Sequence, residues 1–234
     1  MARTIMFQGT SSHVGKSILT TALCRIFKQD GYRVSPFKAQ NMALNSYVTP
    51  SGGEMGRALV AQAEAAGLEP AVEMNPVLLK PTGNSRSQVI VMGRPIGVMS
   101  ASEYHAGYSK KLLGVIGDCL DELQQRYDIV VIEGAGSPAE VNLKANDIVN
   151  MRIALMVQAP VFLIADIDRG GAIASVVGTI SLLEPEEQDR VQGIILNKFR
   201  GDINLLRPAF DIILAKTGKP VVGVIPHLEN IGID

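Results

Sequence analysis

The sequence predicts an α/β protein in which helices cover both faces of a mostly parallel sheet. Short runs rich in Ile and Val alternate with helical patterns along the chain, which is the sequence form of βαβ units. Several of these runs are too continuously apolar to have a solvated face. A chain of 234 residues with 47% hydrophobic positions can bury one sizeable core. We therefore expect a three-layer α/β/α arrangement in a single domain over residues 1–234.

The candidate strands are seven short apolar runs. They are Thr4–Gln8, Arg33–Lys38, Gln88–Met92, Ile129–Glu133, Val161–Asp166, Val191–Asn197 and Val221–Ile225. Their continuous apolar character favours strands that are buried on both faces, as in a parallel sheet covered by helices.

Four stretches between these runs show the helical period. They are Ile18–Phe27, residues 54–66, a long helix from Ser100 to Leu123, and Leu205–Leu214. Ser100 has Glu103 three residues later, which is the spacing of a capping box at a helix start. Cys119 lies on the apolar face of the same helix, so we interpret it as a core residue rather than a nucleophile. Residues 39–53 show no period and predict a long loop, a type of segment that is often functional.

Composition excludes several classes of protein. The net charge of -1 gives no basic surplus for binding nucleic acid. No apolar run approaches the length of a membrane span, and the N-terminus does not resemble a cleavable leader. The two cysteines form no C-x-x-C pair and predict neither a disulfide framework nor a zinc ribbon. We expect a cytoplasmic protein with no nucleic-acid or membrane partner.

The strongest motif follows the first predicted strand and opens the first predicted helix. Its backbone N–H groups and the helix N-terminus can hold phosphates, the lysine can reach the β and γ phosphates, and the serine hydroxyl can ligate Mg²⁺. Five residues separate its two glycines, where the common P-loop has four. An ordinary turn is the alternative, but the strand and helix context favours nucleotide binding. The candidate nucleotide-binding residues here are Gly9, Thr10, Ser12, His13, Val14, Gly15, Lys16 and Ser17.

Two acidic residues end later strands and are candidates for the metal site. Glu133 ends a buried run and is followed by glycines, so its carboxylate would lie where open α/β sheets bind ligands. Mg²⁺ bound to phosphates takes one or two protein carboxylates, and Glu133 with Ser17 would supply the protein ligands. Asp166 is an additional candidate at the next strand end. Either acid could instead cap a turn.

Lys38 and Asn197 also follow predicted strands on this edge of the sheet. Two lysines that converge there need anions, so we assign Lys38 to the γ phosphate or to a substrate carboxylate, with a solvated lysine as the alternative. The amide of Asn197 could pair with a nucleobase. The three histidines, at positions 13, 105 and 227, have no partner at zinc-ligand spacing.

These residues together resemble a known family. The stretched loop GTSSHVGKS is similar to that of the dethiobiotin synthetase-like P-loop proteins. Further blocks resemble the synthetase domain of the cobyric acid synthase family, and the similarity covers essentially the whole chain. The blocks are FKAQNMALNS (37–46), MNPVLLKP (74–81), EGAGS (133–137), DIDRGG (166–171) and NKFRGD (197–202). The first two are more specific than the loop, because generic P-loop ATPases have no reason to carry them.

The resemblance implies a dethiobiotin synthetase-like fold and an ATP-dependent ligase of cobalamin biosynthesis. Such an enzyme amidates the b, d, e and g carboxylates of adenosylcobyrinic acid a,c-diamide, through acyl phosphates, to give cobyric acid. By position, Lys16, Lys38 and Glu133 would be the catalytic residues, ATP and Mg²⁺ the nucleotide and metal, and Asn197 the adenine contact. The corrinoid or acyl-phosphate contacts would be Gln40, Asn41, Asn45, Ser46 and Lys80.

The resemblance also implies a partner. Family members continue into a glutamine amidotransferase domain that supplies ammonia, and we expect this chain to be the isolated synthetase domain, with that function in a removed domain or a separate subunit. Cys24 and Cys119 lie in helical patterns and are not expected to replace its nucleophile. The protein should then use free ammonium but not glutamine. The oligomeric state stays open, with a homodimer as one option.

Two other functions remain as alternatives. Cobyrinic acid a,c-diamide synthase shares the fold and the chemistry but amidates earlier, and the block at residues 37–46 favours the later enzyme. A partition-type regulatory ATPase would carry an additional lysine early in the loop, where this chain has Thr10 and Ser11. The sequence also lacks a basic amphipathic helix for a membrane surface.

Overall fold

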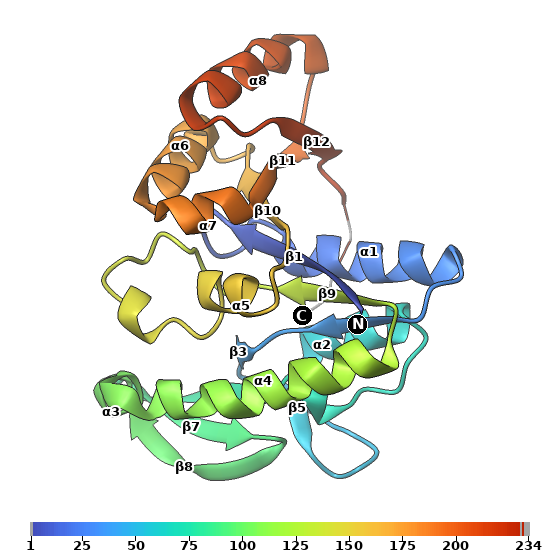
Figure 1. Ribbon diagram of the computed structural model, residues 1–234, viewed down its shortest axis with the longest axis vertical. Coiled ribbons are helices and arrows are strands. Elements are labelled where there is room, and N and C mark those ends of the chain that lie inside the picture. Colours follow the sequence, from blue (N-terminus) through green and yellow to red (C-terminus); the bar gives the residue numbers. More distant parts are fainter. Residues whose placement is uncertain (1, 230, 232–234) are drawn as a thin grey trace.

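A six-stranded, entirely parallel sheet forms the centre of the computed structural model, which describes residues 2–229 and 231 (Figure 1). The strand order is β12-β11-β10-β1-β9-β2. The six strands are β1 (Arg3–Gly9), β2 (Val34–Phe37), β9 (Ile129–Glu133), β10 (Val161–Asp166), β11 (Val191–Phe199) and β12 (Val221–Pro226). The prediction of a mostly parallel sheet is confirmed, and six of the seven predicted runs belong to it.

Helices cover the two faces of this sheet. Successive side chains of β1 point to opposite faces, and because each set includes a buried apolar residue, both faces must be covered. Phe7 packs in one apolar cluster with residues of α1, whereas Met6 packs in a larger cluster on the other face. One face carries α1 (Lys16–Gln29), against which α2 (Arg57–Ala65) packs. The other face carries α4 (Ser109–Arg126), α5 (Met151–Met156), α6 (Ala172–Leu182) and α8 (Ile203–Thr217). The three-layer prediction is therefore confirmed.

A second sheet lies beside the first and was not predicted. Its order is β3-β6-β7-β8, and only the β3–β6 pair is parallel. The strands are β3 (Gln40–Met42), β6 (Val77–Gly83), β7 (Arg86–Val91) and β8 (Arg94–Ser100). Residues 88–92 were predicted as one of the strands of a mostly parallel sheet. Residues 88–91 do lie in a strand, but it belongs to this second sheet, where it pairs antiparallel with β6 and β8 across tight turns.

The long loop predicted over residues 39–53 contains short strands. Besides β3, it holds β4 (Ser46–Val48), which pairs antiparallel with β5 (Glu54–Gly56). The helix predicted from residue 54 consequently begins only at Arg57. Periodicity does not reveal pairs of this length, since three residues hold too few alternations.

The third predicted helix is interrupted near its start. Ser100 and Glu103 make the predicted capping box at α3 (Ala101–Glu103), and a π-helical turn (Tyr104–Tyr108) follows before α4. Gly107 has φ of 123°, a backbone conformation that favours glycine. The predicted apolar face of α4 is buried, including Cys119, and burial raises the pKa of its thiol to about 12. The remaining elements are two short 3₁₀ turns (Val72–Met74 and Lys144–Asn146) and α7 (Pro185–Arg190).

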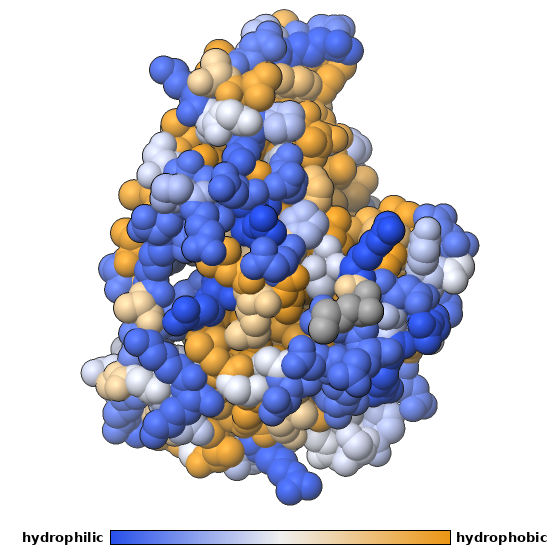
Figure 2. All heavy atoms as spheres, viewed as in Figure 1, coloured by the Kyte–Doolittle hydropathy of each residue, from blue (hydrophilic) through white to orange (hydrophobic). Residues whose placement is uncertain are grey.

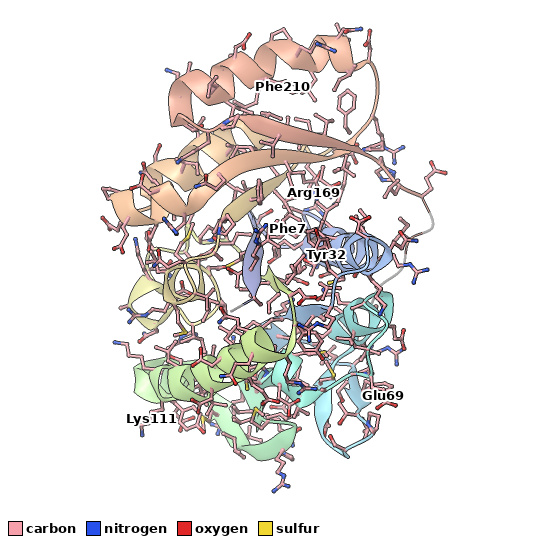
Figure 3. All side chains as sticks on the ribbon, turned by 45° about the vertical axis from the view of Figure 1, so that its right-hand side comes forward. Phe7, Tyr32, Glu69, Lys111, Arg169 and Phe210 are labelled. Atoms are coloured by element: carbon pink, nitrogen blue, oxygen red, sulfur yellow. The ribbon has the colours of Figure 1, made fainter. Side chains whose placement is uncertain are left out.

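The figures show how these parts sit around the central strands. In Figure 3, Phe7 lies on β1 near the middle of the molecule, Phe210 extends from α8 at one end, and Lys111 and Glu69 lie toward the other end. Figure 2 shows hydrophilic residues over much of the outer surface and hydrophobic residues gathered toward the middle of this face. Among the described residues, no helix is both long and apolar enough to cross a bilayer.

Candidate functional site

The loop after β1 is shaped by two glycines. A side chain at Gly9 would put its Cβ 2.6 Å from Val14 Cγ2 and 2.9 Å from Lys16 Nζ. Gly15 has φ of 102°, and a Cβ there would overlap the side-chain amide of Asn197. Larger residues at either position would therefore push the loop open, which explains the glycine spacing read from the sequence.

Lys16 stands at the first position of α1 and turns back into the loop. Its Nζ donates to the carbonyl oxygens of Ser11 and Gly136, both at 3.0 Å. Burial lowers the pKa of Lys16 to about 8, with a further contribution from the charge of Lys38 and an opposing one from Glu133. The ammonium is thus held by neutral carbonyls, which phosphate oxygens could replace with a stronger, charge-assisted contact.

Glu133, at the end of β9, gathers three donors. Its Oε1 accepts from Lys38 Nζ at 2.7 Å and from Ser17 Oγ at 2.9 Å, and its Oε2 accepts from Gln62 Nε2 at 2.6 Å. The carboxylate is 1% exposed. Burial alone would raise the pKa of Glu133, but the charge of Lys38 and these hydrogen bonds hold it below its usual range. The three sequence candidates Ser17, Lys38 and Glu133 therefore meet in one buried cluster.

Gln62 is a member of this cluster that sequence reasoning missed. It lies on α2, is fully buried, and its Oε1 has no hydrogen-bond partner among the described residues. A glutamine inside a buried helical stripe of Ala, Leu and Val was the available signal, because buried amides need partners. No motif marked it as functional.

Asn75 is a second missed residue, although its block was noted for other reasons. Its Nδ2 donates to the carbonyl of Lys38 at 3.1 Å and to that of Val77 at 3.0 Å. Its Oδ1 accepts from the Gly56 amide at 3.0 Å. Asn75 thus fixes the backbone from which the Lys38 side chain extends, and it links that backbone to the start of α2.

Two residues near the end of β11 hydrogen-bond to the backbone of the loop that follows β1. Asn197 Nδ2 donates to the Val14 carbonyl at 2.7 Å, and Lys198 Nζ donates to the His13 carbonyl at 2.7 Å. Lys198 also pairs with Asp166 at 2.7 Å. Asn197 therefore contacts the nucleotide-binding loop, and its amide nitrogen is hydrogen-bonded to the loop backbone. Asp166 lies with Lys198, outside the Glu133 cluster.

The five candidate substrate residues divide into two groups. Asn41 and Asn45 line the same cavity as the loop, whereas Gln40, Ser46 and Lys80 have partners outside it. Gln40 Oε1 accepts from Tyr104 Oη at 2.5 Å. Lys80 Nζ lies 2.8 Å from Glu54 Oε2, which also accepts from Ser46 Oγ.

The phosphate loop, Lys38, Glu133 and residues 41–45 line one cavity of about 820 Å³. Its loop side is lined by residues 12–13, 15–18, 135–136 and 198, and its other side by residues 41–45 and 57–58. Lys38 and Glu133 lie between the two sides. Thr10 and Val14 support the loop instead: Thr10 N donates to Ile164 O at 2.9 Å, and Val14 is buried.

Fold and site together define a P-loop nucleotide-binding α/β protein. The hydroxyl of Ser17 and the carboxylate of Glu133 are hard oxygen donors beside the phosphate loop, so the donor set fits Mg²⁺. The chain belongs to the family described as the CobQ/CobB/MinD/ParA nucleotide binding domain, whose model matches residues 5–233.

Curated relatives agree with this assignment. The chain is 68% identical over 231 residues to cobyric acid synthase of Pelotomaculum thermopropionicum, covering 99% of this chain and 44% of that protein. It is 65% identical over 232 residues to cobyric acid synthase of Desulfitobacterium hafniense (strain DSM 10664 / DCB-2), covering 99% and 45%. The chain thus spans less than half the length of these relatives.

Solved structures support the fold alone. The cell division protein FtsY of Thermotoga maritima superposes with a TM-score of 0.54 at 15% identity, covering 97% of this chain and 63% of that one. At this level of identity the likeness extends to the architecture and not to the function.

Proposed function

We propose that this domain amidates the b, d, e and g carboxylates of adenosylcobyrinic acid a,c-diamide, with ATP, to give cobyric acid. The substrate and the reaction are those that the sequence resemblance implies, and relatives that carry the name cobyric acid synthase support this choice. The observation that carries it is the buried cluster of Ser17, Lys38 and Glu133 between the two sides of one cavity. A ligase of this kind must bring a phosphate donor and a carboxylate acceptor together at one point.

The chemistry requires activation of a poor electrophile. The acceptor carboxylate attacks the γ phosphorus of ATP, the bond to ADP breaks, and an acyl phosphate forms. Ammonia then attacks the acyl carbon, the bond to the phosphate oxygen breaks, and the proton that the nitrogen loses is taken up by the leaving inorganic phosphate. Each amidation therefore consumes one ATP and yields ADP and phosphate.

The residues of the cluster suit the first of these steps. Lys16 and Lys38 would neutralise the charge of the transferring phosphoryl group. Ser17 and Glu133 would hold Mg²⁺, which when bound withdraws charge from the phosphate oxygens. Glu133 would remain an ionised ligand, since its pKa is held low. The loop amides and the α1 N-terminus would hold the phosphates.

The other side of the cavity would receive the corrinoid, with Asn41 and Asn45 as its polar contacts. Ammonia would come from a glutamine amidotransferase domain or subunit. The relatives are about twice as long as this chain, which supports assigning ammonia supply to a part outside residues 1–234.

The test is ADP release from Mg-ATP and ammonium, with and without adenosylcobyrinic acid a,c-diamide, while the corrinoid is followed by mass. We expect stepwise losses of about one mass unit, each coupled to one ADP, and no support from glutamine alone. In the folded Lys16→Ala variant, turnover should fall by about two to three orders of magnitude. ATP turnover that leaves the corrinoid unchanged would refute the proposal and favour a regulatory ATPase.

A further inference from the structure

Four cationic side chains from lysine or arginine line the cavity, and three of them have partners. Lys16 donates to two carbonyls, Lys38 pairs with Glu133, and Lys198 pairs with Asp166. Arg57, at the first position of α2, makes no hydrogen bond or ion pair with any described residue. It is exposed, and its guanidinium is therefore available to a ligand.

The surroundings of Arg57 indicate what kind of ligand this would be. Met42 and Leu44 line the same side of the cavity and are 62% and 72% exposed. Two large apolar side chains left this open beside a binding cavity favour a ligand with an apolar body. Arg57 beside them favours an anionic group on that body, and the guanidinium matches a carboxylate in a bidentate manner.

The loop side of the cavity does not need this cation. Lys16 and Lys198 line the loop side and Lys38 lies between the two sides. Arg57 instead lines the side that also holds Asn41 and Asn45. The chemistry of the two sides therefore differs. One side offers lysines and backbone amides for phosphates, and the other offers apolar surface with one arginine.

We propose that Arg57 anchors one of the acceptor's b, d, e and g carboxylates while another of these four reacts, and that Met42 and Leu44 contact the acceptor's apolar body. This inference rests on the proposed function, in which the acceptor carries several carboxylates. Each amidation converts a carboxylate into a neutral amide and removes one potential partner of Arg57. The affinity should therefore fall as amidation proceeds, which would help the finished product to leave.

The test compares two corrinoids by equilibrium dialysis, read by their visible absorbance, with a non-hydrolysable ATP analogue present. The probes are adenosylcobyrinic acid a,c-diamide, in which the b, d, e and g carboxylates are free, and the product cobyric acid, in which these four groups are amides. We expect the wild-type protein to bind the acid several-fold more tightly. In Arg57→Ala the affinity for the acid should fall about three- to tenfold, and that for the amide less than twofold.

Two variants and one further titration separate the explanations. Arg57→Lys should lie between the wild-type protein and Arg57→Ala, because it keeps the charge but loses the planar fork. Arg25→Ala removes another exposed arginine, on α1, that does not line the cavity, and it should change neither affinity. Affinity for a fluorescent ATP analogue should be unchanged in Arg57→Ala.

The outcomes that overturn the inference are distinct from those that overturn the proposed function. Equal losses for acid and amide, no loss for either, or a loss of nucleotide affinity in Arg57→Ala would each refute the role of Arg57 alone. A wild-type protein that binds neither corrinoid would refute the proposed function, and the anchoring role with it.

Discussion

Two lysine–glutamate pairs of this molecule have nearly the same geometry and very different surroundings. Lys38 and Glu133 are 2.7 Å apart with side chains 10% and 1% exposed, whereas Lys80 and Glu54 are 2.8 Å apart with side chains 25% and 26% exposed. The first pair lies at the carboxyl ends of β2 and β9 in the parallel sheet. The second joins β6 to β5 beside it.

The difference lies in the consequence of losing one member. Removing one partner of a buried pair leaves an uncompensated charge in a low-dielectric site, which costs about 3–5 kcal/mol. A pair that water reaches contributes about 0–1 kcal/mol, because water replaces the lost partner. The first pair is therefore a fixed part of the structure, whereas the second can exchange its partners for other polar groups.

The largest expected effect comes from Glu133→Gln. The neutral amide keeps the shape but leaves Lys38 without an anion, so the free energy of unfolding should fall by about 3–5 kcal/mol. Urea denaturation followed by circular dichroism measures this. Glu54→Gln is the matched control and should lose about 1 kcal/mol or less. Equal losses in the two variants would contradict the comparison.

Gln62→Met tests the hydrogen bond that Gln62 donates to Glu133 of the first pair. The thioether fills the space of the amide but cannot donate to Glu133 Oε2, so stability should fall by about 1–3 kcal/mol. The gain in nucleotide affinity on adding Mg²⁺ should shrink as well. Gln124→Met, at another buried glutamine on α4, is the control. If Mg²⁺ raised the nucleotide affinity of Gln62→Met as much as that of the wild-type protein, Gln62 would have a packing role only.

The pH dependence of nucleotide binding tests the lowered pKa of Lys16, which is influenced by the nearby Lys38–Glu133 pair. Its pKa of about 8 lies below the usual value for lysine, so the ammonium is lost as pH rises through 8 in the nucleotide-free protein. Affinity for an ATP analogue should therefore fall several-fold between pH 7 and pH 9. Lys16→Ala should bind weakly without this decline. A flat wild-type profile would show that Lys16 keeps its proton throughout.

The smallest effect concerns the exposed pair. A double-mutant cycle with Lys80→Met and Glu54→Gln should give a coupling of about 0.2–1 kcal/mol, since both groups are reached by water. Raising the salt concentration should reduce this coupling further. A coupling above about 2 kcal/mol would mean that the second pair behaves like the buried one.

Sequence reasoning succeeded where chemistry and strand position coincide. Lys16 and Ser17 come after β1 and its loop, Lys38 follows β2, and Glu133 ends β9. The carboxyl ends of parallel strands meet at one edge of a sheet. Their convergence could therefore be predicted without coordinates. The role of each in binding or catalysis stays a prediction.

Three features could not be predicted, because they depend on tertiary contacts that leave only weak signals in the local sequence. They are the contact of Gln62 with Glu133, the pairing of residues 88–92 and the partner of Asp166. Gln62 is one polar residue in a buried helix, and only the fold reveals that it faces Glu133. Residues 88–92 look like any buried strand, because the period of a strand is the same in parallel and antiparallel pairing. Asp166 ends its strand as predicted, but Lys198 next to Asn197 brings a competing partner.

The position of β1 between β9 and β10 also determines when this protein can mature on the ribosome. Arg3 pairs with Ile129 and Met6 with Val161, so both neighbours of the first strand are synthesised long after it. At about 5–20 residues per second, many seconds pass before either one emerges. During this interval both edges of β1 are bare, and Lys198, which clasps the following loop, does not yet exist. The nucleotide site is therefore incomplete on the early nascent chain, and the edges of β1 stay open to mispairing until β9 and β10 have been synthesised.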